Sequence, residues 1–204
     1  GSHLASDAVY PNMHTNTSDA EASDSHPKII TNGIQVSEGL YDNNNVTFVV
    51  WNWKAGGGTT SSNGDGSKTS TVQANTEAGF SIVLYSGDTS SFTVGHGLDF
   101  APEWVIVKSR THSERWAVFH TSISNQYIYL SDTFAGETSN ADERFGNSTS
   151  VVVPSATVVT LGANNSDVSK NGENYVMYCF HSVEGFSRFG QYYGNGSTNG
   201  TFVY

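Results

Sequence analysis

Short apolar runs separated by turn residues extend along most of this chain. They recur roughly every ten residues, with Gly, Asn, Ser or Pro between them. No stretch repeats its apolar positions with a helical period over three turns. This spacing is typical of sandwiches and barrels, so we predict an all-β fold: an antiparallel β-sandwich of the jelly-roll, concanavalin or lectin-like kind. The predicted strands are 46–54, 80–85, 104–108, 115–120, 126–131, 151–153, 157–161 and 174–181.

The strand predicted most clearly by pattern is Val46–Lys54. Apolar residues occupy both of its faces, whereas a strand with one wet face would alternate apolar and polar residues. We therefore expect this strand at the centre of a sheet, covered on both sides. Its Trp51 is expected in the core, as are Trp104 and Trp116 in two later strands.

The pattern of Gly79–Lys108 predicts two strands joined by a Gly-rich bend. The first three residues of this region recur later in the chain. Gly79-Phe80-Ser81 recurs as Gly185-Phe186-Ser187, and the preceding segments Phe48–Gly56 and Tyr175–Gly185 share an apolar pattern. Self-similarity of this kind indicates an array of like units. We predict a β-sandwich repeat domain over residues 46–184 and the truncated start of a second repeat over 185–204. Chance similarity between two β-rich stretches is the alternative.

The N-terminal region differs in composition from the rest. Residues 1–6 resemble the scar of a removed expression tag. Residues 7–45 are predicted to be a polar linker or extended arm, because they contain too little apolar area to offset ordering. The pair Asn32-Gly33 lies between β-branched residues and predicts a short hairpin within this arm.

Charge excludes several partner classes. The chain has 19 acidic and 9 basic residues and a formal net charge of −10. Nucleic-acid backbones and anionic membrane surfaces require clustered Lys or Arg, so we expect neither as a partner. No apolar stretch approaches the roughly 20 residues of a membrane-spanning helix, so we expect no membrane insertion.

Metal and thiol chemistry have weak support. Cys179 is the only cysteine and lies in an apolar strand, where a buried hydrophobic role is favoured over a nucleophile. The segment Asn63–Ser67 resembles half of a calcium loop but lacks the closing Glu, so a plain turn is favoured over a cation site near Asp65. We predict no cofactor and no bound metal.

Recognised catalytic motifs are missing from the sequence. There is no phosphate-binding Gly loop, no nucleophile elbow and no paired-His zinc motif. Asp99 and Glu103 flank Pro102 and could supply the two carboxylates of a glycosidase, or could be solvated loop acids. We predict that the chain is not an enzyme.

Binding is the function that the composition favours, because aromatic residues make up 12% of the chain. Trp53 near a strand end and the Tyr192-Tyr193 pair beside a Gly-rich turn are the best candidates for exposure. His96 lies between two glycines, where a hydrogen bond to the local backbone is the simplest role and a ligand contact and metal ligation are the alternatives. The predicted ligand-binding residues are Trp53, His96, Asp99, Tyr192 and Tyr193.

Several of these motifs together resemble a repeat domain of tailed-phage structural proteins. The resemblance rests on FVVWNWKAGGG (48–58), on GFSIVLYSG and TVGHGLDFAPEWVIVK within 79–108, on YVMYCFHSVEGFS (175–187) and on GQYYGNGSTNGTFVY (190–204). They occur in the same order as in that family, mainly in phages of marine and cyanobacterial hosts. Residues 1–45 carry no such likeness, and His181-Ser182 departs from the family pattern.

The resemblance implies a lectin-like β-sandwich in a tail fibre, tail spike or other virion appendage. It implies adhesion to host-surface carbohydrate, contacts with other virion proteins and a homo-oligomer, by analogy a trimer. It also suggests that Trp53 and His96 belong to fold signatures. A structural spacer or virion decoration domain and a polysaccharide depolymerase are the alternatives.

Overall fold

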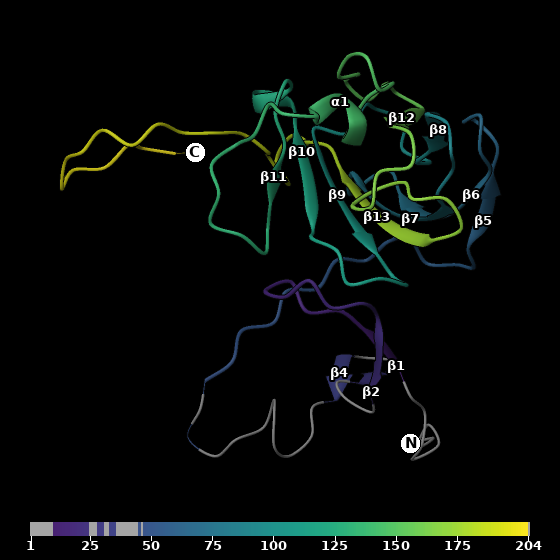
Figure 1. Cartoon of the computed structure of the whole chain (residues 1–204). Helices are drawn as coiled ribbons and strands as arrows, with labels where there is room; N and C mark the ends of the chain where they lie inside the picture. Colours follow the sequence, from purple (N-terminus) through teal and green to yellow (C-terminus); the bar gives the residue numbers. More distant parts are fainter. Residues whose placement is uncertain (1–9, 25–27, 31–32, 36–44, 46, 204) are drawn as a thin grey trace.

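The body of the protein is built on one large antiparallel sheet. The computed structural model describes residues 10–24, 28–30, 33–35, 45 and 47–203. Seven strands hydrogen-bond in the order β11-β10-β9-β13-β7-β6-β5 (Figure 1). Their bounds are β5 Ser61–Asn63, β6 Ser70–Asn75, β7 Phe80–Ser86, β9 Trp104–Ser109, β10 Ala117–His120, β11 Ile128–Tyr129 and β13 Asn174–Phe180.

A second layer covers one face of this sheet. It consists of β8 (Phe92–Gly95) paired antiparallel with β12 (Val158–Leu161). Between the layers lies the larger hydrophobic core, to which Val94 and Leu161 contribute from the small sheet and Val83, Val107 and Met177 from the large one. The predicted all-β antiparallel sandwich is therefore confirmed.

The central strand β13 shows why the sequence forms this arrangement. Neighbouring residues of a strand point to opposite faces. Tyr175, Met177 and Cys179 accordingly lie in the larger core, whereas Phe180 and Tyr178 lie in a second cluster on the other face. Both faces are thus buried, which explains the nearly continuous apolar run.

Aromatic rings dominate the second cluster. Phe180 stacks between Phe80 and Trp104, with ring centroids 4.7 and 4.9 Å away. Phe189 adds a tilted contact to Phe180 at 5.5 Å. These rings come from β7, β9, β13 and the segment after β13, so the cluster ties the C-terminal segment to the sheet.

The N-terminal arm is fastened to the body. Its strands β1 (Tyr10–Asn12) and β2 (Ala22–Asp24) pair with each other, as do β3 (Lys28–Ile30) and β4 (Gly33–Gln35). Glu21 accepts two hydrogen bonds from the Arg110 guanidinium, at 2.6 and 2.9 Å. Trp116 Nε1 donates to the carbonyl of His14.

Pairing of β3 with β4 agrees with the predicted hairpin, although Asn32 lies outside the described residues. The arm therefore contains more ordered structure than its composition predicts, because specific polar contacts with the sheet replace the missing apolar burial.

The predicted central strand Val46–Lys54 is wrong for the residues that the structure describes. Residues 47–54 form no strand, and Trp51 is 74% exposed. The position between β7 and β9 is occupied by β13, whose pattern resembles that of 48–53. One position in the sheet cannot hold two strands, and Phe48–Trp53 lies outside the sheet as an exposed segment.

The region 79–108 also differs from its prediction. β7 and β9 both form, but β13 lies between them, and the intervening bend contains β8 of the second layer. The strands β5 and β6 are not among the predicted strands. Val151–Val153 forms only one isolated bridge, between Val151 and Gly146, and no strand. The predicted strands 115–120 and 126–131 form, in shorter versions, as β10 and β11, which pair with each other.

Two short helical turns interrupt the β structure, a 3₁₀ turn at Thr121–Ile123 and α1 at Ala141–Arg144. The charged run Asp142-Glu143-Arg144, which by composition alone resembles a solvated loop, lies in α1. Arg144 is partly buried and forms an ion pair with Asp167 at 2.8 Å. Within the described residues, neither turn has the length or apolarity needed to cross a membrane.

Residues 185–203 leave the body after the second cluster. In Figure 1 this yellow segment runs away from the sandwich, turns and comes back toward its starting point. Its described residues form no strand, and most are exposed. A second repeat unit starting at 185 stays a prediction.

Candidate functional site

The excursion that begins at Arg188 folds back on itself, and we call residues 188–203 the C-terminal clamp. At its tip, Asn195 Nδ2 donates to the carbonyl of Asn199, and Asn195 Oδ1 accepts from the Ser197 amide. Further back, Thr201 Oγ1 donates to the carbonyl of Tyr193. The bonds from Asn195 to Asn199 and from Thr201 to Tyr193 join the outgoing and returning limbs. Gly196 supplies the positive φ of 66° at the turn.

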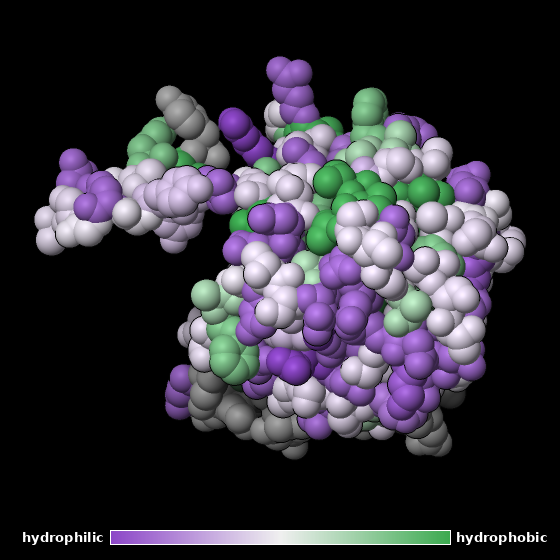
Figure 2. Space-filling view, turned by 45° about the horizontal axis from the view of Figure 1, so that its top comes forward, coloured by the Kyte–Doolittle hydropathy of each residue, from purple (hydrophilic) through white to green (hydrophobic). Residues whose placement is uncertain are grey.

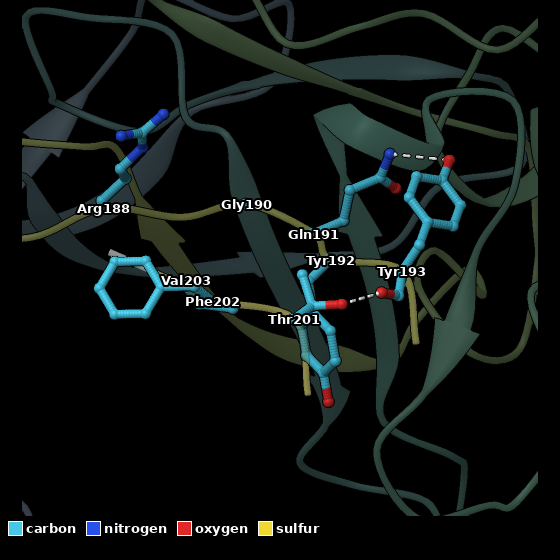
Figure 3. A pocket seen from close by; sticks show the side chains of 8 residues that line it. All are labelled: Arg188, Gly190, Gln191, Tyr192, Tyr193, Thr201, Phe202 and Val203. Carbon is cyan, nitrogen blue, oxygen red and sulfur yellow. Dashed lines mark hydrogen bonds between the residues drawn. The ribbon is translucent and has the colours of Figure 1, made fainter. Parts of the chain in front are cut away.

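The two limbs of the clamp enclose a hollow of about 500 Å³. Figure 3 shows the side chains around it, with Gln191 Nε2 donating to the Tyr193 hydroxyl and Thr201 facing the Tyr193 carbonyl. The residues around this hollow are Arg188, Gly190, Gln191, Tyr192, Tyr193, Thr201, Phe202 and Val203.

The lining combines aromatic rings with hydrogen-bonding groups. Tyr192 and Tyr193 are 69% and 77% exposed, so their rings and hydroxyls can meet a ligand. Figure 2 shows the clamp standing away from the body, where a large partner can reach it. Aromatic faces beside amide, hydroxyl and guanidinium groups are suited to a hydroxylated ligand such as a sugar.

Trp53 does not join the clamp residues in this hollow. It is 58% exposed, which confirms the predicted exposure, and its ring meets Phe180 edge-on at 6.2 Å. Trp53 therefore caps the second aromatic cluster from the Phe48–Trp53 segment. Of the other tryptophans, Trp116 is buried and Trp104 is half-buried, whereas the predicted burial of Trp51 is wrong.

The proposed ligand contact of His96 is wrong, because the imidazole is fully buried. Its Nδ1 accepts from the Leu98 amide, and its Nε2 lies 3.2 Å from the carbonyl of Ser155, to which it donates in this tautomer. Burial lowers the pKa of His96 and favours this neutral form. Gly97 follows with a positive φ of 71° that closes the turn. The structural role is confirmed.

The two acids flanking Pro102 have different environments. Asp99 is exposed on the loop after β8. The carboxylate of Glu103 accepts a 2.6 Å hydrogen bond from the Ser182 backbone amide. Glu103 thus holds the start of the C-terminal segment against β9. A hydrolytic role would need this carboxylate free, whereas here it has a structural role.

Two further predictions concern the thiol and the cation loop. Cys179 is fully buried, and burial raises the pKa of its thiol, so its hydrophobic role is confirmed. Asp65 lies in the turn between β5 and β6, where its amide donates to Asn63 Oδ1. In the part of the chain that the structure describes, no group of His, Cys, Asp and Glu is placed to hold a metal ion.

Sequence reasoning therefore singled out the two tyrosines of the clamp and missed the rest, including Phe202. The polar groups of the hollow belong to Arg188, Gln191 and Thr201. The spacing of these residues in the sequence does not predict that they line one hollow. The signal that was present is the Tyr pair next to Gly194-Asn195-Gly196, since a Gly-rich turn brings two limbs together.

Comparison with known proteins gives a family and no function. The sequence profile described as "Domain of unknown function (DUF7483)" matches residues 2–204, so the chain belongs to that family. No curated protein and no solved structure matches the chain.

Proposed function

We propose that this member of the DUF7483 family is a non-enzymatic binding domain of a phage virion appendage, such as a tail fibre or spike. In this proposal the C-terminal clamp holds carbohydrate of the host surface. The virion setting rests on the resemblance of residues 48–58, 79–108, 175–187 and 190–204 to repeats of tailed-phage proteins.

The observation that carries the binding proposal is the hollow of the clamp. Two exposed tyrosines and Phe202 line it together, on a segment that projects from the sandwich (Figures 2 and 3). Sugar rings present C–H faces that pack on aromatic rings and hydroxyls that bond amide and hydroxyl groups. One shallow hollow gives weak affinity, which several copies on one particle would raise through avidity.

Binding of the purified chain to host cells and to their isolated envelope polysaccharide tests this proposal. We expect Tyr193→Ala to weaken binding about tenfold, in line with an aromatic contact of about 1 kcal/mol plus its buried area. Trp51→Ala is the matched control, because Trp51 is equally exposed but lies outside the clamp. Equal loss in both variants, or no binding by the wild-type chain to any host envelope, would refute the adhesion role.

An assembly role is the second candidate, and the exposed segment Phe48–Trp53 favours it. Five of its side chains, all apolar, are each between 44% and 74% exposed, which is unusual for a monomer surface. As a spacer or decoration domain, the chain would bury this segment against another subunit. Analytical ultracentrifugation distinguishes the roles: a stable oligomer that Trp51→Asp dissociates supports assembly, and a monomer up to high concentration contradicts it.

A further inference from the structure

The arginines of this chain differ in whether they have an acidic partner. Arg110 pairs with Glu21 at 2.6 Å, Arg115 with Asp132 at 3.4 Å and Arg144 with Asp167 at 2.8 Å. Arg188 is exposed and forms no ion pair with any residue that the structure describes. In a chain of net charge −10, acids are plentiful, so an arginine without one is notable.

Arg188 lines the clamp hollow and is the one charged residue among those that line it. The residues that line the hollow include no Asp and no Glu. Figure 3 shows the guanidinium of Arg188 beside the limb that carries Gly190 and Gln191. Glu103 and Glu184 line a neighbouring hollow, to which Arg188 also contributes. The carboxylate of Glu103 is engaged by the Ser182 amide, which leaves Glu184 as the nearby acid to control for.

We propose that the clamp selects acidic sugars, in which a ring carboxylate bonds the Arg188 guanidinium while the tyrosines pack against the sugar. This inference rests on the proposed carbohydrate-binding function and adds the charge class of the ligand. The planar guanidinium presents a fork of N–H donors that matches a carboxylate in a bidentate way, which a neutral hydroxyl cannot reproduce. The overall negative charge of the protein otherwise repels such ligands, so selectivity depends on this one local cation.

The test uses a glycan array that carries pairs of uronic-acid glycans and their carboxyl-reduced counterparts. Each pair has the same linkages and differs only in the carboxylate. The wild-type chain is expected to bind the carboxylated member about tenfold more tightly, a preference that weakens as salt is raised because the site is exposed. Arg188→Gln should bring the ratio of the affinities for the two members of each pair close to one.

Two variants complete the design. Glu184→Gln removes the nearby acid and is expected to keep or increase the preference for carboxylated glycans. Tyr193→Ala should weaken both members of each pair alike, because it removes the packing surface and keeps the guanidinium. Arg188, Glu184 and Tyr193 are all exposed, so an unchanged urea midpoint verifies that each variant folds.

The outcomes separate this inference from the proposed function. Equal binding of both members of each pair, or a preference that survives Arg188→Gln, overturns the acidic-sugar inference and leaves carbohydrate binding standing. Failure of the wild-type chain to bind any glycan overturns both. Self-association of the chain that Arg188→Gln abolishes would show that this arginine pairs with a second copy, and would also overturn the inference.

Discussion

The buried ion pair between Arg144 and Asp167 gives the sharpest stability prediction. The side chains of Arg144 and Asp167 are only 11% and 4% exposed, and the Tyr129 hydroxyl donates to the same carboxylate oxygen at 2.7 Å. Asp167→Asn keeps the shape and removes the charge. Breaking one side of a buried pair costs about 3 to 5 kcal/mol, because the remaining charge loses its compensation.

The structure favours the low end of that range. Arg144 keeps two other acceptors, the Tyr129 hydroxyl at 2.8 Å and the carbonyl of Asn140 at 3.2 Å. We therefore expect Asp167→Asn to lower the free energy of unfolding by about 3 kcal/mol. For a chain of this size that corresponds to a fall in Tm of roughly 6 to 12 °C.

Urea denaturation followed by tryptophan fluorescence measures this loss. Asp132→Asn is the matched control, since the Arg115–Asp132 pair is longer, at 3.4 Å, and its side chains are 44% and 27% exposed. Its loss should stay below about 0.5 kcal/mol. A loss of that small size for Asp167→Asn as well would refute the reasoning that this pair fastens α1 to the sandwich.

Three further predictions concern other parts of the fold. Burial lowers the pKa of His96, so as the pH falls the imidazole is protonated in the unfolded chain before it is protonated in the folded one. The free energy of unfolding should therefore fall as the pH drops below about 6.5. Urea midpoints measured across that range should depend less on pH in His96→Asn than in the wild-type chain. The buried Cys179 thiol should not react with Ellman's reagent until the chain unfolds, and rapid reaction of the native protein would contradict its burial. Glu21→Gln should loosen the N-terminal arm, seen as faster amide exchange at residues 13–21 with the sheet unchanged, because it weakens the paired hydrogen bonds to Arg110.

Local pattern predicted the long strands well because burial on both faces demands continuous apolar residues. β7, β9, β12 and β13 all form close to their predicted bounds. The same reasoning placed Val46–Lys54 wrongly. An apolar pattern shows that a segment is able to form a buried strand, but it does not show which of two similar segments takes the central position in the sheet. That choice depends on the contacts of β13 with β7 and β9, which are long-range.

Strands with few apolar residues, and ion pairs between distant residues, were not predicted for a related reason. β6, Ser70–Asn75, contains only Val72 and Ala74 as apolar residues, so its pairing with β7 decides its conformation. Asp142-Glu143-Arg144 reads as a solvated charge cluster, yet its arginine meets Asp167, which lies 23 residues along the chain. Contacts between residues so far apart leave no local periodicity.

The candidate site was predictable only in part. Tyr192 and Tyr193 are exposed, as their position beside a Gly-rich turn predicts. Trp53 is exposed too, but the prediction placed it at the end of a strand that does not form. A local structural role was the simplest interpretation of His96, but a histidine between glycines also permits a ligand contact. Its hydrogen bond to Ser155, 59 residues away, decides the matter.

Carbohydrate binding by the C-terminal clamp is most directly tested by NMR titration of the isotopically labelled chain with oligosaccharides released from the host envelope. The account predicts that shift changes concentrate at Arg188, Gln191, Tyr192, Tyr193 and Thr201, with the core residues Val83 and Met177 unaffected. Changes confined to another surface, or none at saturating oligosaccharide, would contradict it.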